Sequence, residues 1–390
     1  MPPTCAPDNR PPDGGGEAWF AGLRARGVVE CVDLEAQPER VAAGGVWAVV
    51  GDFDGPVRAW RFADVVREPV GVGSSGPPAG AEPGQAAWCG PALSSWSTSL
   101  DRGGYVAAVE AVREEIRAGR VYQATLCRVL AAPLTASAAP GTGRGGEPDA
   151  DALARVLAAG NPAPFSGAVH VPAATGFPPV WVVTASPELY LRVDGDVVTS
   201  APIKGTGLTA ADLQGKDRAE NVMITDLVRN DLQRVCTAGT VEVTSLLAVE
   251  HHPGLVHLVS TVQGRLEPAV VAAPDRWARI LRATYPPGSV SGAPKNAALR
   301  VIAALESVPR GPYCGVVGWI DAEAGRAELA VGIRTFWWLA DDVAGSGRAR
   351  PGTLRFGTGA GITWGSEPAA EWAETELKAD LLIRLASTPA

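Results

Sequence analysis

The sequence predicts an α+β fold in which helices flank large antiparallel β-sheets. Apolar strand-like runs and helical patterns follow one another without the regular alternation that a parallel sheet requires. One stretch also has the pattern of a β-hairpin, because Leu189, Leu191 and Val193 alternate with polar residues. The turn follows at residues 194–196, and an apolar strand returns at residues 197–199. No internal repeat is visible.

The composition excludes several classes of protein. The chain has 390 residues, of which 46% are hydrophobic, which is enough for one large domain or two ordinary ones. A net charge of −8 argues against a general nucleic-acid partner, although cations clustered at one site could still bind a small anion. The six cysteines are widely spread, without zinc or redox spacing, as in a cytoplasmic protein. We expect no membrane partner, because no stretch is long and apolar enough to cross a bilayer and the first residues lack signal-peptide features.

The chain divides into three parts. Residues 1–16 are rich in proline and glycine and are expected to be disordered. Residues 17–100 form a reduced N-terminal part with short strands and a Gly/Pro-rich loop at 71–90, and residues 101–390 form the main domain. Within the main domain we expect a helix, a strand and a second Gly/Pro-rich loop at 105–119, 121–130 and 136–148.

A lysine and a glutamate stand out near the predicted hairpin. Glu188 follows Ser-Pro just before the first strand, and Lys204 lies between Ile203 and Gly205 just after the returning strand. The glycine would let a ligand approach the backbone closely. The pattern alone is equally consistent with a functional lysine and with a solvated structural one.

Residues 216–235 are predicted to form a helix that carries acids on a core-facing stripe. Asp217 and Glu220 are three residues apart, and Ile224 and Leu227 continue the same face. Buried carboxylates are unfavourable unless they are paired or bound to a metal. The alternative is an ion pair within the helix, with Lys216, Arg218 or Arg229 as the partner.

Residues 368–385 repeat this arrangement in a second predicted helix. Glu371, Glu374 and Lys378 share one face, and leucines continue the stripe. Four carboxylates without histidine or cysteine nearby suit Mg²⁺ rather than Zn²⁺. We therefore predict a magnesium site between the two helices, with a solvated helix surface as the alternative.

Many short motifs follow one another in order over about three quarters of the chain, and together they resemble the chorismate-utilising enzymes. The motifs are YQA at 122–124, NPAP at 161–164, SPE at 186–188, PIKGT at 202–206, KDRAEN at 216–221, DLVRNDL at 226–232, HLVS at 257–260, SGAPK at 291–295, RGPYCG at 310–315, GIRT at 332–335, GAGI at 359–362 and the acids at 371 and 374.

The resemblance implies two antiparallel sheets flanked by helices, with a chorismate site buried between them in residues 101–390. Isochorismate and salicylate synthases carry a lysine base where this chain has Gln123. Anthranilate synthases usually carry alanine where this chain has Lys204, whereas aminodeoxychorismate synthases carry lysine there. The resemblance is therefore closest to aminodeoxychorismate synthase component I, which aminates chorismate.

The resemblance also assigns roles to individual residues. Lys204 would be a covalent nucleophile, Glu188 the general acid, and His257 a neighbour of the leaving group or else a hydrogen-bonded core histidine. Magnesium would be held by the four carboxylates Asp217, Glu220, Glu371 and Glu374. Contacts to the substrate are expected from Gln123, Gly205, Thr206, Ser291, Tyr313, Arg334, Gly359, Ala360, Gly361 and Lys378.

No glutaminase signature surrounds any of the cysteines or histidines, so ammonia is expected from solution or from a separate glutamine amidotransferase subunit. Anthranilate synthase component I, or a related aminating enzyme, is the alternative activity. A third possibility is a catalytically silent subunit that binds the amidotransferase. The unusually short connection after Thr206 is the feature that favours this third possibility.

Overall fold

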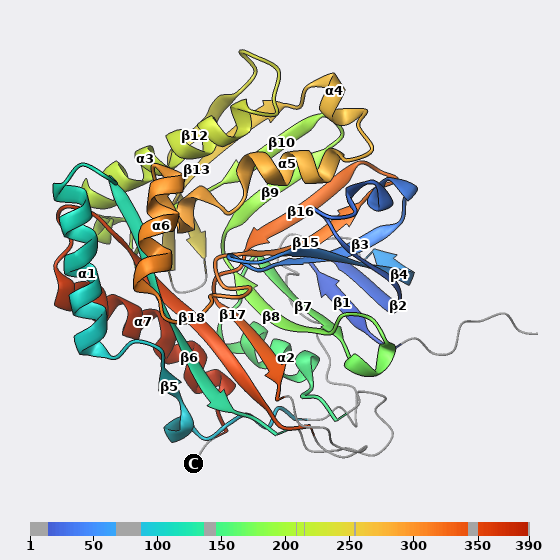
Figure 1. Ribbon diagram of the computed structural model, residues 1–390, viewed down its shortest axis with the longest axis horizontal. Coiled ribbons are helices and arrows are strands. Elements are labelled where there is room, and N and C mark those ends of the chain that lie inside the picture. Colours follow the sequence, from blue (N-terminus) through green and yellow to red (C-terminus); the bar gives the residue numbers. More distant parts are fainter. Residues whose placement is uncertain are drawn as a thin grey trace, which may run out of the picture.

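A computed structural model describes residues 15–67, 87–135, 146–207, 209–213, 215–252, 255–341 and 350–388 (Figure 1). The predicted disorder of residues 1–16 and the predicted loops at 71–90 and 136–148 lie mostly outside the described residues. No helix in the described ranges is both long enough and apolar enough to cross a membrane.

The described residues form strands and helices in a mixed order. The strands are β1 (Glu17–Phe20), β2 (Leu23–Asp33), β3 (Val46–Gly51), β4 (Val57–Arg67), β5 (Ser97–Thr98), β6 (Gln123–Pro133), β7 (Phe165–Val171), β8 (Val180–Ser186), β9 (Leu189–Asp194), β10 (Val197–Ala201), β11 (Ile203–Gly207), β12 (Glu242–His252), β13 (Leu255–Arg265), β14 (Gly292–Ala293), β15 (Val316–Asp321), β16 (Arg326–Val331), β17 (Thr335–Ala340) and β18 (Gly352–Ile362). The α-helices are α1 (Arg102–Arg117), α2 (Ala150–Gly160), α3 (Gly215–Gln233), α4 (Pro268–Val271), α5 (Arg276–Thr284), α6 (Lys295–Leu305) and α7 (Pro368–Ala386).

The predicted α+β class is confirmed. All pairings between the named strands are antiparallel. They link the 18 strands into one continuous hydrogen-bonded network, whereas the resemblance implied two separate sheets. Helices α1, α6 and α7 gather beside β6 and β18, while α3 and α5 lie beside β9, β10 and β13 (Figure 1). The predicted hairpin is β9–β10, with Val197 opposite Asp194.

Helix α1 agrees with the predicted helix at 105–119 and begins three residues earlier. Asp101 caps it, because its carboxylate accepts a hydrogen bond of 2.8 Å from the N–H of Gly104. Tyr105, Val109 and Val112 are buried on one face, as their helical spacing requires. Helices α3 and α7 likewise agree with the predicted acidic helices.

Buried polar contacts fix the two acidic helices to the sheet. Asn221 of α3 donates a hydrogen bond of 2.9 Å to the carbonyl of Leu258 in β13. Arg128 of β6 is 2% exposed and donates to the hydroxyl of Thr375 in α7 at 3.0 Å. The guanidinium of Arg128 also lies 4.2 Å from the ring centre of Trp372. These contacts set the positions from which the carboxylates of α3 and α7 project.

Candidate active site

Glu188 lies buried at the start of β9, with only 4% of its surface exposed. Burial raises the pKa of its carboxyl group to about 7. Hydrogen bonds to Ser289 and to the backbone of Ile203, together with the charge of Lys204, oppose this rise. The predicted proximity of Glu188 and Lys204 is therefore present, and the carboxyl group can exist in either protonation state near neutral pH.

Lys204 and Gln123 face the same point above Gly361. A methyl group built on Gly361 would lie 2.4 Å from Nε2 of Gln123 and 3.4 Å from Nζ of Lys204. Gln123 is fully buried, yet neither its amide nitrogen nor its amide oxygen has a hydrogen-bond partner. Lys204 forms no ion pair within 4.0 Å and no hydrogen bond with any other described residue, although its charge acts on Glu188, Glu220 and Glu374. Buried polar groups rarely stay unpaired, so this arrangement is typical of a site that awaits a polar ligand.

Gly205 brings Lys204 close to α3. Its φ of +87° is in the left-handed region that favours glycine. A side chain here would also collide with the helix, because a methyl group on Gly205 would lie 2.8 Å from Cβ of Asp217. The sequence suggested that this glycine admits a ligand, whereas in the structure it admits α3.

Arg334 is a second cation without an acidic partner among the described residues. Burial lowers the pKa of its guanidinium group, and its φ of +52° is unusual for a residue with a side chain. Strained backbone of this kind is often found at functional sites. Arg334 therefore has the charge and the free donors that a carboxylate ligand needs.

Tyr313 is buried against β18, where glycine makes room for its ring. A methyl group built on Gly357 would lie 2.0 Å from Cγ of Tyr313, so no larger residue fits there. Gly359 and Gly361 follow on the same face of β18, against Cys127 and against Gln123 with Lys204. Ala360 faces the other way and belongs to a hydrophobic cluster with Tyr105 and Val109.

The carboxylates of α3 and α7 lie close together around Lys216. The Nζ atom of Lys216 is 3.7 Å from Glu220 and 3.4 Å from Glu371. Burial raises the pKa of Glu220, the charges of Lys204 and Lys216 oppose this rise, and the charges of Glu371 and Asp217 add to it. The ion pair with Lys216, the alternative considered from the sequence, is thus present in the structure.

Whether these acids fit a metal ion depends on their free oxygen atoms. In the described ranges, no three His, Cys, Asp or Glu residues converge in metal-ligand geometry. However, Oε1 of Glu220, the atom 3.7 Å from Nζ of Lys216, is buried without a hydrogen-bond partner, and Glu371 and Asp217 lie near Glu220. An unsatisfied carboxylate oxygen beside further carboxylates is chemically suited to Mg²⁺, provided that Lys216 moves aside.

Lys378 and Glu374 are paired with each other across one turn of α7. The Nζ atom of Lys378 lies 2.6 Å from Oε1 of Glu374 and donates a hydrogen bond of 3.0 Å to the carbonyl of Gly359. Burial raises the pKa of Glu374, but the ion pair with Lys378 and the charges of Lys204 and Lys216 together outweigh burial and leave the pKa below its usual value. Lys378 therefore ties α7 to β18 in this state, and its predicted contact with a substrate remains a prediction.

The predicted roles of Ser291, His257 and Thr206 in the site remain predictions. Ser291 is fully buried, and its hydroxyl donates to the carbonyl of Pro287 at 3.0 Å. His257 is 2% exposed in β13, opposite the backbone of Thr206 in β11. The side chain of Thr206 lies outside the described part of the structure.

Two residues of this site were not predicted from the sequence. Ser289 hydrogen-bonds Glu188, although only Ser291, two residues further along the chain, was singled out. Lys216 contacts acids from both helices, but it was considered only as a helix surface partner. Lys216 begins the motif KDRAEN at 216–221, whereas Ser289 lies just before the motif SGAPK at 291–295. Only the packing of the 3₁₀ turn at Gly288–Val290 and of α7 brings them to the acids.

Comparisons with known proteins agree with this geometry. A sequence model of the chorismate binding enzymes matches residues 81–384. Anthranilate synthase component 1 of Saccharolobus solfataricus is 34% identical over 73% of this chain and 62% of its own length. Aminodeoxychorismate synthase of Streptomyces griseus is 36% identical over 74% of this chain and 37% of its own length. The chain thus spans less than two thirds of these curated relatives.

Solved structures share the fold. A putative 2,3-dihydroxybenzoate-specific isochorismate synthase from Bacillus anthracis aligns with a TM-score of 0.74 at 22% identity, covering 97% of both chains. Anthranilate synthase component I from Streptococcus pneumoniae aligns with a TM-score of 0.69 at 22% identity, covering 98% of this chain and 94% of that chain.

Proposed function

The chain belongs to the chorismate binding enzymes, and we propose that it is the synthase component that converts chorismate and ammonia to 4-amino-4-deoxychorismate. The observation that carries the proposal is the unpaired Lys204 beside the buried carboxyl group of Glu188. Lys204 donates no hydrogen bond to another described residue, so its amine is available to a ligand, and only the neutral amine is a nucleophile.

The proposed mechanism uses Lys204 and Glu188 in two steps. The neutral amine of Lys204 attacks the ring carbon next to the ring carboxylate, while Glu188 gives its proton to the departing ring hydroxyl, which leaves as water. Ammonia then attacks the carbon that lost the hydroxyl and expels Lys204. Covalent catalysis thereby divides one difficult substitution into two easier ones. A pKa of about 7 suits Glu188 to give and regain a proton in each cycle.

Gln123 supports amination rather than addition of water. Its amide is neutral and cannot act as a base toward water, but its unpartnered nitrogen and oxygen can hydrogen-bond a ligand. A lysine at this position would supply the missing base. The residue therefore favours a nucleophile that is reactive without deprotonation, as ammonia is.

Charged groups are available for both carboxylates of chorismate. Arg334 and Tyr313 would bind one of them. Glu220 and Glu374 would hold Mg²⁺, with Asp217 and Glu371 contributing directly or through water. When bound, Mg²⁺ would polarise the other carboxylate of chorismate. The orphaned oxygen of Glu220 is the structural reason for this assignment.

Anthranilate synthase component I remains the second candidate, because relatives of both activities have similar identity to this chain. Lys204 is the residue that favours aminodeoxychorismate. A silent amidotransferase-binding subunit is a third candidate, favoured by the short connection after Thr206 and opposed by Lys204 and the acids.

One assay separates these candidates. The purified chain is incubated with chorismate, Mg²⁺ and ammonium, and the products are separated by chromatography. We expect 4-amino-4-deoxychorismate; anthranilate would support the second candidate, and tight chorismate binding without product the third. We also propose that glutamine replaces ammonium only when a separate glutamine amidotransferase is added. Turnover of glutamine by the isolated chain would contradict this last point.

A further inference from the structure

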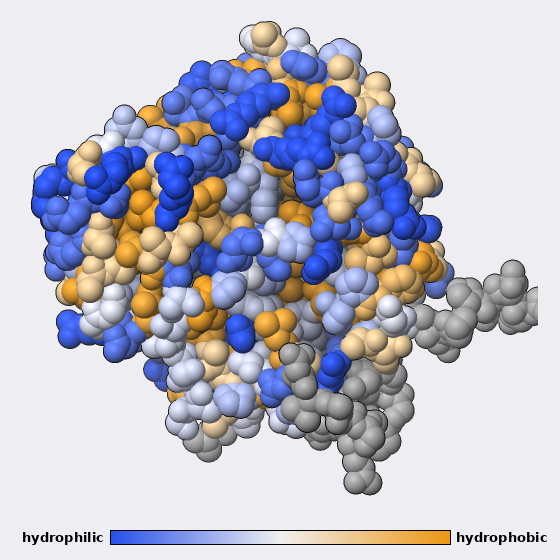
Figure 2. Space-filling model, in the orientation of Figure 1, coloured by the Kyte–Doolittle hydropathy of each residue, from blue (hydrophilic) through white to orange (hydrophobic). Residues whose placement is uncertain are grey.

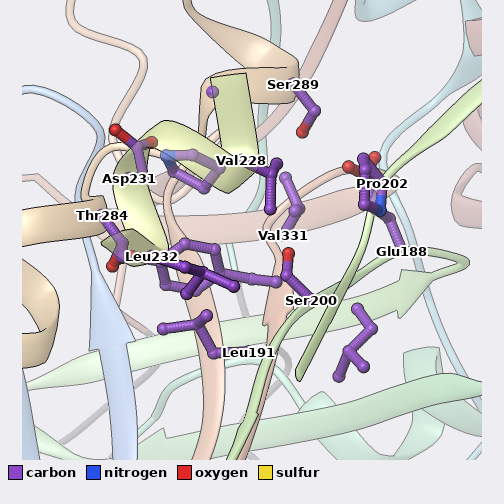
Figure 3. Close-up of a pocket in the computed structure, with 14 residues that line it drawn as sticks. Glu188, Leu191, Ser200, Pro202, Val228, Asp231, Leu232, Thr284, Ser289 and Val331 are labelled. Carbon is purple, nitrogen blue, oxygen red and sulfur yellow. Dashed lines mark hydrogen bonds between the residues drawn. The ribbon is translucent and has the colours of Figure 1, made fainter. Parts of the chain in front are cut away.

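A small cavity extends from Glu188 into the protein between β9, β10, α3 and the turn before β14 (Figure 3). Glu188 and Pro202 lie at one end of it, and Asp231 and Thr284 lie at the other. The cavity has a volume of about 20 Å³ for the centre of a water-sized molecule, which is enough for one such molecule. A chorismate ring cannot enter, so this space is distinct from the chorismate site.

The cavity wall is mostly hydrocarbon, with a few hydroxyl groups. Val228, Leu232 and Val331 supply apolar surface along its length. The hydroxyls of Ser200 and Ser289 point inward (Figure 3). Such a space accepts a small neutral molecule with hydrogen-bonding ability, but it disfavours a bare ion because burying a charge is costly.

An ion pair lies at the far end of the cavity, where Asp231 contributes to the wall. Nζ of Lys295 lies 2.6 Å from Oδ2 of Asp231 and donates a hydrogen bond of 2.9 Å to the carbonyl of Thr284. The side chain of Lys295 is 17% exposed, whereas that of Asp231 is 8% exposed.

We infer that this cavity is the site from which neutral ammonia reaches the reacting carbon and into which the departing water moves. The inference rests on the proposed amination. In that reaction the amine ends where the hydroxyl was, so ammonia must arrive beside the group that protonated the hydroxyl. That group is Glu188, which lines one end of the cavity.

The proton balance closes through Glu188. Its carboxyl group gives one proton to the ring hydroxyl as the carbon–oxygen bond breaks, and water enters the cavity. Ammonia replaces the water and forms the carbon–nitrogen bond as the bond to Lys204 breaks. The resulting ammonium group returns one proton to the Glu188 carboxylate, which restores the acid for the next cycle.

The test narrows the cavity without touching the catalytic groups. Gly288 lines the cavity, and a methyl group built on it would lie 3.5 Å from Cβ of Leu227 and 3.7 Å from Oδ2 of Asp231. Gly288→Ala is therefore accommodated without a clash. We expect it to raise the KM for ammonia about tenfold, because the added methyl group occupies part of a space that holds one small molecule. Chorismate affinity, measured by calorimetry without ammonia, should stay unchanged.

A second variant and a control complete the experiment. Ser200→Thr adds a methyl group at the other side of the cavity and should act in the same direction. Gly103→Ala in α1 is the control, because it adds the same group at an exposed position with only Asp101 nearby. An unchanged ammonia KM in both folded cavity variants would overturn the inference while leaving the amination intact. A parent chain that forms no aminated product from ammonium would instead contradict the proposed function.

Discussion

The positive charge of Lys204 acts on the buried carboxyl group of Glu188. Burial raises the pKa of Glu188 to about 7, and the hydrogen bond to Ser289 and the charge of Lys204 partly offset this rise. The two side chains thus depend on each other. A neutral Lys204 would let the pKa of Glu188 rise further and keep its proton in place. The form that attacks chorismate is therefore also the form in which the general acid is loaded.

The first prediction concerns the pH dependence of turnover. A general acid with a pKa of about 7 loses its proton above that pH, so kcat should fall as the pH rises through this range. Glu188→Gln should lower kcat by about two to four orders of magnitude and remove this limb of the profile. Initial rates across the pH range measure both effects. Glu110→Gln, at an exposed helix position, is the control and should keep the parent profile.

The second prediction concerns the pH dependence of stability. A carboxyl group whose pKa is raised in the folded state loses stability as the pH rises, whereas one whose pKa is lowered loses stability as the pH falls. The pKa of Glu188 is raised in the folded state from 4.5 to about 7. Its contribution to stability is fully present below pH 4.5 and is lost as the pH rises to about 7. Above pH 7, the free energy of unfolding of Glu188→Gln, measured by chemical denaturation, should therefore exceed that of the parent by about 1 to 3 kcal/mol. Equal stability of the two proteins at that pH would show that Glu188 is not desolvated.

The elements of the fold were largely predictable because they follow from local patterns. The alternation from Leu189 to Val193 and the turn after it predict β9–β10, and the spacing of Tyr105, Val109 and Val112 predicts α1. The connection of all strands into one network was not predictable. It depends on long-range pairs such as β6 with β18, which lie more than 200 residues apart in the chain.

The site was predictable in its residues but not in their partners. Sequence motifs place Lys204, Gln123 and Gly361 in the site, and the structure brings the three together. The same motifs cannot show that Lys216 reaches Glu371, because that contact depends on how α3 packs against α7. Ser289 was missed for the same reason, since its contact with Glu188 is made across two distant segments.

The third prediction concerns magnesium binding. Glu220→Gln and Glu374→Gln should each abolish magnesium-dependent turnover while leaving the fold intact, because each removes a charged ligand. Binding of Mg²⁺ alone, followed by calorimetry, provides a readout besides activity. Asp380→Asn changes an exposed acid on the same helix, paired only with Arg384, and should bind Mg²⁺ like the parent. Normal Mg²⁺ binding and turnover in both glutamate variants would remove the carboxylate site.

The fourth prediction concerns the buried pair Arg310–Glu306. Arg310 is 1% exposed, lies 2.6 Å from Glu306 and donates to the carbonyls of Thr125 and Val290. Arg310→Met should destabilise the fold by about 3 to 5 kcal/mol, because Glu306 is then left buried and unpaired. Chemical denaturation measures the loss. Arg384→Met, which breaks an exposed pair, should cost less than about 1 kcal/mol.

The fifth prediction tests the nucleophile. Lys204→Ala removes the amine that would form the covalent intermediate but leaves Arg334, Glu188 and the carboxylates of α3 and α7 in place. Formation of aminodeoxychorismate should therefore fall by orders of magnitude, since only positioning and electrostatic effects remain.

The products of this variant are as informative as its rate. Loss of the side chain opens space above Gly361, where ammonia can attack beside the ring carboxylate, so some anthranilate should form. Chromatography of the products and intact-protein mass spectrometry of the parent, which should show a chorismate adduct that Lys204→Ala lacks, distinguish the two routes. A Lys204→Ala variant that makes aminodeoxychorismate at the parent rate would refute the nucleophile. Lys204 would then act only through its charge on Glu188, and anthranilate synthesis would again be an equal candidate for this chain.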